Sequence, residues 1–204
     1  MSTQQRIIQY LVDNDRRLKT VTQQCPFPRS RKSADIYMAL LSSIVSQQLS
    51  IKAADTIFNR FLALYPDQYP PPEQLARTRA TRLRAAGLSK QKAQYLKNVA
   101  RFAIEEDGLN YRKLQKKTDQ ELIDHLTQIK GVGRWTVEML LMFSLDRKDI
   151  FPVDDLGIQQ AIKKLYQLEY EGKELKQRMQ TIAENWKPYR SIVCKYLWHW
   201  KALS

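Results

Sequence analysis

The chain has 204 residues, of which 43% are hydrophobic, so it can bury a real core as one domain or as two packed lobes. Its formal net charge of +13 favours an anionic partner. Nucleic acid suits that charge better than a membrane, because no apolar run approaches the roughly 18 residues of a spanning helix. The 2 cysteines exclude a disulfide framework and a four-thiolate metal cluster.

The N-terminal stretch predicts an amphipathic helix around Ile7–Val12, followed by a proline-rich break at Cys25–Pro28. Met1–Arg6 is polar and lacks the apolar region of a signal peptide, so we expect a cytoplasmic protein. Three basic residues after the break are interpreted either as DNA contacts or, more simply, as a solvated face: Arg29, Arg31 and Lys32.

The helical pattern then runs through residues 36–44, breaks at Ser46–Ser50 and resumes through residues 53–61. Two amide side chains, Gln47 and Gln48, lie at the break. Their simplest role is to satisfy the backbone of the junction, and a binding role is the alternative.

A proline-rich loop at Tyr69–Pro72 leads into the next helix. Four arginines are spread around that helix, which argues against a single DNA-binding stripe: Arg77, Arg79, Arg82 and Arg84. Gly87–Ser89 ends it and caps the following helix, which carries Lys92. Further on, Thr118 and Glu121 form a capping box that predicts the start of another helix.

Residues 122–145 predict a helix, a tight glycine turn and a second helix. Gly131 and Gly133 supply the turn, since glycine alone enters positive φ without steric cost. Apolar residues are too dense in the second helix for a surface position, so we expect burial on most sides: Val137, Leu140, Leu141 and Phe143.

A glycine turn that leads into a helix N-terminus presents unpaired N–H groups and the positive end of the helix dipole. This arrangement can bind a phosphate, and Arg134 can add a charge-assisted contact. The alternative is a plain helical hairpin with glycine for packing, because short glycine motifs are weak signals.

Two adjacent acids, Asp154 and Asp155, precede an apolar-periodic helix. One Asp suffices as an N-cap, and a second acid there stays ionised because the helix dipole favours the anion. An anion next to a phosphate-binding turn weakens the affinity for DNA. The same anion would, however, stabilise a cation that develops during a reaction on DNA.

The C-terminal third is rich in aromatic residues, which are usually core but can in part line a pocket: Tyr166, Tyr170, Trp186, Tyr189, Tyr196, Trp198 and Trp200. The chain has only 6 Gly and few strand-like alternations, so the predicted fold class is all-α.

Residues 122–160 resemble the helix-hairpin-helix plus Gly/Pro…Asp signature of DNA base-excision glycosylases, in the variant of the AlkA-like 3-methyladenine DNA glycosylase II branch. Three further stretches agree in the same order: Leu40–Asp55, Gly87–Leu96 and Trp186–Trp198. The resemblance covers the chain from about Asp35 to Trp200.

The resemblance implies two helical lobes with an active-site cleft between them. Residues 36–152 would form the central lobe and end in the hairpin at about 122–145, while residues 1–35 and 153–204 would form the other. It also places the catalytic carboxylate at the acidic pair. Counted from Trp135, the AlkA-like spacing selects Asp155, while other branches would select Asp154. We take Asp155 as catalytic and Asp154 as the helix cap.

The resemblance further assigns roles to single residues. Glycosylases that also nick the backbone carry a Lys at the position of Trp135, so we expect no lyase activity. Trp135, Trp198 and, more weakly, Tyr37 would form the base pocket, where an aromatic face suits a cationic alkylated purine. Met139 and Leu156 replace tyrosines of the family, which leaves the substrate range open. Expected DNA contacts are Gln48, which would fill the gap of the flipped base, and Gly131, Gly133, Arg134, Thr136, Ser89 and Lys92.

No cofactor is required by this reading. The carbonyls of Thr127, Ile129 and Val132 can hold a structural Na⁺ or K⁺, as the resemblance implies, and the cysteines for an iron–sulfur cluster are missing. The isolated His125 and His199 do not suggest zinc.

The expected function is therefore excision of alkylated purines, of the 3-methyladenine type, from double-stranded DNA containing damaged bases. We expect a monomer in the cytoplasm or nucleoid, or in the nucleus of a eukaryote, with no membrane partner. One alternative is a non-catalytic helix-hairpin-helix module, which explains the charge but not the acidic pair. Another is a glycosylase of the same fold for oxidised or mismatched bases.

Overall fold

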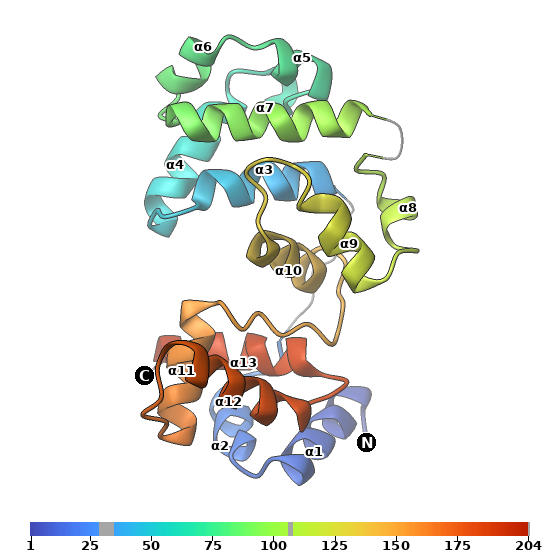
Figure 1. Ribbon diagram of the computed structural model, residues 1–204, viewed down its shortest axis with the longest axis vertical. Helices are drawn as coiled ribbons and strands as arrows, with labels where there is room; N and C mark the ends of the chain where they lie inside the picture. The colour runs from blue at the N-terminus through green and yellow to red at the C-terminus, as the bar shows by residue number, and fades with distance from the viewer. Residues whose placement is uncertain (29–34, 106–107, 204) are drawn as a thin grey trace. The chain divides into compact units, whose positions relative to one another are not determined.

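The computed structural model describes residues 1–28, 35–105 and 108–203, and all regular secondary structure in these ranges is helical. The chain divides into two compact units (Figure 1). The terminal unit comprises Met1–Arg31 and Leu141–Ser204, and the central unit comprises Lys32–Leu140. The predicted all-α chain with two helical lobes is confirmed.

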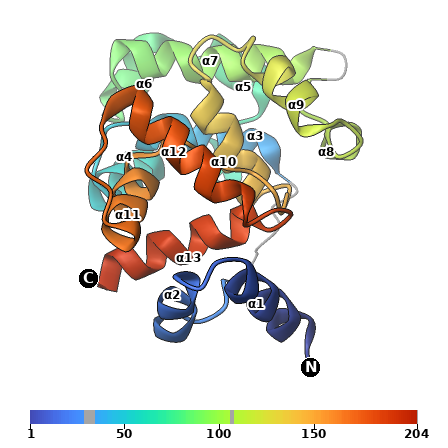
Figure 2. The same cartoon turned by 60° about the horizontal axis from the view of Figure 1, so that its bottom comes forward.

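The terminal unit is built around its last helix. Its helices are α1 (Thr3–Asn14), α2 (Leu18–Gln24), α11 (Leu156–Tyr166), α12 (Gly172–Glu184) and α13 (Arg190–Leu203). Helix α13 packs on both α11 and α2 (Figures 1 and 2). A polar contact adds to this core: Asp15 accepts hydrogen bonds from the hydroxyl of Tyr166 and from Trp186 Nε1, the latter at 3.0 Å.

The central unit is organised by α7, which packs on α3, α5 and α6 (Figure 1). The apolar face of α7 recurs at helical spacing, and Ala93, Leu96 and Val99 are all buried. The unit contains α3 (Ile36–Ser46), α4 (Ile51–Leu62), η1 (Pro66–Gln68), α5 (Pro72–Arg77), α6 (Ala80–Ala85), α7 (Lys90–Ile104), α8 (Tyr111–Leu114) and α9 (Asp119–Leu126). Helix α10 (Arg134–Phe143) begins in it and ends in the terminal unit.

The unit boundary differs from the expected one, because residues 141–152 belong with the terminal helices. Hydrogen bonds to the start of α13 explain the difference. Arg190 donates to the Asp149 carboxylate at 2.7 and 3.0 Å, and Ser191 N–H donates to the carbonyl of Lys148 at 2.9 Å. The Ile150 N–H in turn donates to Ser191 Oγ at 2.9 Å. The segment that leads to the acidic pair is thereby fixed to α13.

Within the described ranges, no helix has both the length and the apolar character needed to cross a bilayer.

Candidate active site

The glycine turn between α9 and α10 depends on Gly131. Its φ is +109°, and a Cβ at this position would lie 2.2 Å from Cγ of the Tyr95 ring. The turn therefore needs glycine at position 131 for two reasons, its backbone conformation and its packing on α7.

The helix before the turn, α9, begins as predicted. Thr118 is its N-cap, and the capping box includes the Glu121 side chain.

Gly133 differs from the expectation, because its φ is not in the left-handed region. A Cβ there would meet nothing within 4 Å. The residue immediately precedes α10, and it has no side chain with which to cap the first N–H groups of that helix. The turn thus leaves open space in front of a helix N-terminus, which is the arrangement that a phosphate needs.

The site residues predicted in the first turn of α10 differ in their exposure to solvent. Arg134 is exposed, and its Nε donates to Oε1 of the buried Glu138 at 3.0 Å. Trp135 is 39% exposed. Thr136 is only 3% exposed, so its contact with a phosphate stays a prediction.

The carbonyls predicted to hold a monovalent cation also lie at this turn. Thr127 follows α9 directly, and the carbonyl of Ile129 accepts the Val132 N–H at 2.9 Å, which leaves it one lone pair. Carbonyl oxygens are the hard ligands that such ions take, and the Na⁺ or K⁺ site at this turn stays a prediction. Over the described residues, no group of three or more His, Cys, Asp or Glu could hold a metal ion.

The loop at 47–50, between α3 and α4, carries the predicted Gln48. This residue is exposed and has a φ of +57°. The amide of Gln47 donates to the Gly131 carbonyl at 3.3 Å, which joins the loop to the glycine turn. Leu49 is also exposed, and the sequence analysis did not consider it as a candidate. An apolar residue inside a helix break was the available signal.

Three other predicted residues in the central unit have protein partners. Ser89 Oγ caps α7 by accepting the Lys92 N–H at 3.1 Å. Lys92 Nζ donates to the carbonyls of Val45 and Gln47. Tyr37 is buried, its hydroxyl donates to the Pro70 carbonyl at 2.9 Å, and burial raises its pKa. The predicted Arg29, Arg31 and Lys32 lie outside the described residues.

In the terminal unit, Asp155 is the N-cap of α11 and is 9% exposed. Its Oδ1 accepts the Ile158 N–H at 2.8 Å and Trp198 Nε1–H at 2.8 Å. Two N–H donors from different helices thus fix the carboxylate and stabilise its negative charge.

The predicted capping role of Asp154 is wrong. Its side chain is exposed and pairs with Lys176 Nζ at 2.6 Å on the surface. The chain begins α11 one residue later than that prediction requires, so one acid, Asp155, both caps the helix and occupies the buried position.

Gly157 is a residue that the sequence prediction did not single out. A Cβ there would lie 3.0 Å from Asp155 Oδ1 and 3.1 Å from Trp198 Nε1. The missing side chain lets the indole reach the carboxylate. A glycine in the first turn of a helix with regular apolar spacing was the signal for such a close approach.

Aromatic surface adjoins this pair. The rings of Phe143 and Trp198 stack with centroids 5.7 Å apart, and Lys195 Nζ lies 5.1 Å from the Phe143 centroid. Phe143 is 46% exposed, so the expectation that it is buried is wrong. It is the last residue of α10, where helical periodicity no longer reports packing. Leu156, next to Asp155, is exposed as well.

Comparison with known proteins adds the decisive observation. Residues 41–188 match the family model described as HhH-GPD superfamily base excision DNA repair protein. The chain belongs to the HhH-GPD superfamily. The match includes both the glycine turn and the Asp155–Gly157 segment, as the resemblance predicted.

Relatives and solved structures agree with this membership. The chain is 37% identical over 179 residues to DNA-3-methyladenine glycosylase 1 of Schizosaccharomyces pombe, covering 86% of this chain and 77% of that protein. A fission-yeast 3-methyladenine DNA glycosylase, solved in complex with abasic DNA, superposes with a TM-score of 0.85 at 34% identity and covers 95% of each chain. The Bacillus halodurans DNA-3-methyladenine glycosidase gives 0.82 at 37% identity and covers 98% of this chain and 90% of that one.

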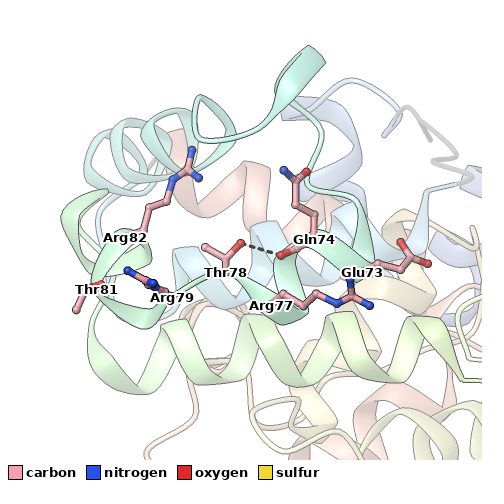
Figure 3. Close-up of a pocket in the computed structure, with 7 residues that line it drawn as sticks. All are labelled: Glu73, Gln74, Arg77, Thr78, Arg79, Thr81 and Arg82. Atoms are coloured by element: carbon pink, nitrogen blue, oxygen red, sulfur yellow. Dashed lines mark hydrogen bonds between the residues drawn. The ribbon is translucent and has the colours of Figure 1, made fainter.

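The central unit of this HhH-GPD chain also contains a hollow. It has a volume of about 880 Å³ and is formed by α5, α6 and the residues that join them (Figure 3). Three arginines line it with Glu73, but Arg82 already donates to the Leu64 carbonyl at 2.8 Å. Arg77, Arg79 and Arg82 point in different directions in Figure 3. The sequence prediction placed these arginines on one helix, and that is wrong, because the chain breaks at Thr78–Arg79 between α5 and α6.

Proposed function

We propose that this chain is a monofunctional DNA glycosylase that flips an alkylated purine, of the 3-methyladenine type, out of double-stranded DNA and hydrolyses its N-glycosidic bond. The observation that carries the proposal is the buried Asp155 carboxylate, fixed by Trp198 on a chain of the HhH-GPD superfamily. The relatives named 3-methyladenine DNA glycosylase support the substrate class.

Asp155 supplies the charge that the reaction needs. When the bond between C1′ and the purine nitrogen breaks, its electron pair leaves with the base and the sugar becomes an oxocarbenium-like cation. A preorganised carboxylate stabilises this cation without reorganising at the moment of reaction. Water then bonds to C1′ and releases a proton, which gives the abasic sugar.

The leaving base requires no acid in this scheme. A purine methylated at N3 or N7 carries a positive charge before cleavage and departs as a neutral molecule. Stacking and cation–π attraction make aromatic faces suitable partners for such a base. Trp198 and Phe143 present aromatic surface next to Asp155, and Trp135 and Tyr37 remain further candidates for the pocket.

Strand cleavage is not part of the proposed reaction. A lyase step needs an amine that attacks C1′ to form a Schiff base. Trp135 stands at the position of that lysine in the resembling family and has no amine. Water is therefore the nucleophile, and the abasic strand stays intact.

The glycine turn would bind the DNA backbone. The open space at Gly133, the N–H groups at the start of α10 and the exposed Arg134 favour a phosphate, and a Na⁺ or K⁺ on the turn carbonyls would add positive charge. Gln48 would occupy the space of the flipped base. A monomer acting in the nucleoid, or in the nucleus of a eukaryote, is the simplest form of this proposal.

The test is base release from duplex DNA treated with a methylating agent, with the released bases separated by chromatography. We expect free methylated purines and strands that break only after hot alkali. Strands nicked without alkali would contradict the monofunctional proposal. Binding without release of any base, from methylated, oxidised or mismatched duplexes, would favour the non-catalytic alternative.

A further inference from the structure

The ammonium group of Lys92 is bonded to the protein main chain rather than directed into solvent. Lys92 lies in the first turn of α7, and its Nζ donates to the carbonyls of Val45 at 2.8 Å and Gln47 at 2.7 Å. These carbonyls lie at the C-terminal end of α3, where unpaired oxygens and the helix dipole attract a cation. Burial lowers the pKa of Lys92.

The same loop is held from a second side. The Gln47 side chain donates to the Gly131 carbonyl at 3.3 Å, and the Leu49 N–H donates to the Ser46 carbonyl at 3.2 Å. Beyond these bonds, Gln48 and Leu49 are exposed, and Gln48 has a φ of +57°. The base of the loop is therefore fixed by α7 and by the glycine turn, while its tip faces solvent.

We infer that Lys92 is a positioning residue, which holds the loop 47–50 against the glycine turn so that Gln48 and Leu49 meet the DNA at a fixed place while a base leaves the stack. This role replaces the phosphate contact expected from sequence, because two of the three N–H donors of Nζ are already bonded to main-chain carbonyls. The inference rests on the proposed function.

The experiment compares Lys92→Met, Lys92→Arg and two controls from the same helix. Lys97→Met removes a similar bond from α7, to the Thr78 carbonyl at 3.1 Å, away from the loop. Lys90→Met removes an exposed charge. Single-turnover release of a methylated purine is measured opposite its normal partner base and opposite an abasic analogue, where leaving the stack costs less. Salt dependence of DNA binding and thermal stability are measured for each protein.

We expect Lys92→Met to slow release from the paired substrate by about tenfold, and release opposite the abasic analogue by much less. Lys92→Arg should recover most of the loss, and both controls should behave like wild type on each substrate. Equal losses on both substrates would reduce Lys92 to a structural residue. If the slope of log DNA affinity against log salt concentration falls by about 1 in Lys92→Met but not in Lys90→Met, Lys92 contacts a phosphate instead. Either result overturns the inference.

Hydrogen exchange at loop 47–50 separates this inference from the proposed function. We expect faster exchange of the Leu49 amide in Lys92→Met and unchanged exchange in Lys97→Met. If wild type releases no base, the proposed function fails, and the exchange comparison still decides whether Lys92 holds the loop. Unchanged exchange in Lys92→Met would overturn the inference by itself.

Discussion

At the scale of single residues, the indole of Trp198 makes two separable contacts. Its N–H donates to Asp155 Oδ1 at 2.8 Å, and its ring stacks on Phe143. Trp198→Phe keeps an aromatic ring and removes the donor. A hydrogen bond to a charged group is worth roughly 1.5–3 kcal/mol, so we expect base release to slow by about tenfold to a hundredfold, with DNA binding retained.

Single-turnover rates for wild type and Trp198→Phe measure this effect, and thermal unfolding reports any loss of packing. A wild-type rate in Trp198→Phe would show that the indole N–H does not orient the carboxylate.

Gly157 gives a second prediction at this scale. In Gly157→Ala the new Cβ would press on Asp155 Oδ1 and Trp198 at 3.0–3.1 Å, so one of the two groups has to move. Alanine also favours the helix by about 1 kcal/mol over glycine. We therefore expect slower base release from a protein that is as stable as wild type. Unchanged release rates, measured beside the melting temperature, would remove Gly157 from the site.

At the scale of elements, the two glycines of the turn should respond in opposite ways to alanine. Gly131→Ala places a Cβ 2.2 Å from the Tyr95 ring at a φ of +109°, and overpacking of this kind costs about 1–3 kcal/mol before the backbone strain is added. Gly133→Ala meets nothing within 4 Å, so its stability should stay within about 0.5 kcal/mol of wild type.

Gly133→Ala should instead weaken DNA binding, because its methyl group would occupy the space in front of α10. Denaturant unfolding and DNA titration of both variants test the pair. Normal DNA affinity in Gly133→Ala would show that no phosphate approaches this turn.

The sequence was enough to predict an all-helical chain, the Thr118 cap and the place of the glycine turn, because each depends on local spacing or on local hydrogen bonds. It missed the break between α5 and α6 and the short helices α2 and α8, because their ends depend on packing. It did not distinguish Gly131 from Gly133, since only the neighbouring Tyr95 ring makes that difference. It placed the cap of α11 on the wrong acid, because two adjacent aspartates cap equally well until the helix start is known. It also predicted wrongly that Phe143 is buried, because periodicity cannot show where a helix leaves the core.

At the scale of the whole molecule, the unit boundary depended on contacts that are distant in sequence. Asp149 and Ile150 meet Arg190 and Ser191, about 40 residues away along the chain, and no local pattern announces such a bond. The family resemblance, by contrast, was visible in advance because its motifs recur in a fixed order. The active-site cleft expected between the lobes and the role of each site residue stay predictions.

The net charge of +13 makes a prediction about DNA affinity at this scale. Each phosphate contact adds about 0.9 to the slope of log affinity on log salt. Arg134→Met should lower that slope by about 1, whereas Arg84→Met, which removes the same charge from an exposed position on α6, should not. Binding of undamaged duplex between low and high salt measures both slopes. Equal slopes for the two variants would show that Arg134 attracts DNA through its charge alone and contacts no phosphate.

The most direct test of the catalytic assignment compares Asp155→Asn with Asp154→Asn in single-turnover release of a methylated purine. Asparagine caps helices as well as aspartate does, so Asp155→Asn should fold and bind DNA while it loses the charge. We expect its release rate to fall by roughly a hundredfold or more. Asp154→Asn should act like wild type, because it loses only a surface pair with Lys176. Loss of release in Asp154→Asn with normal release in Asp155→Asn would contradict the account.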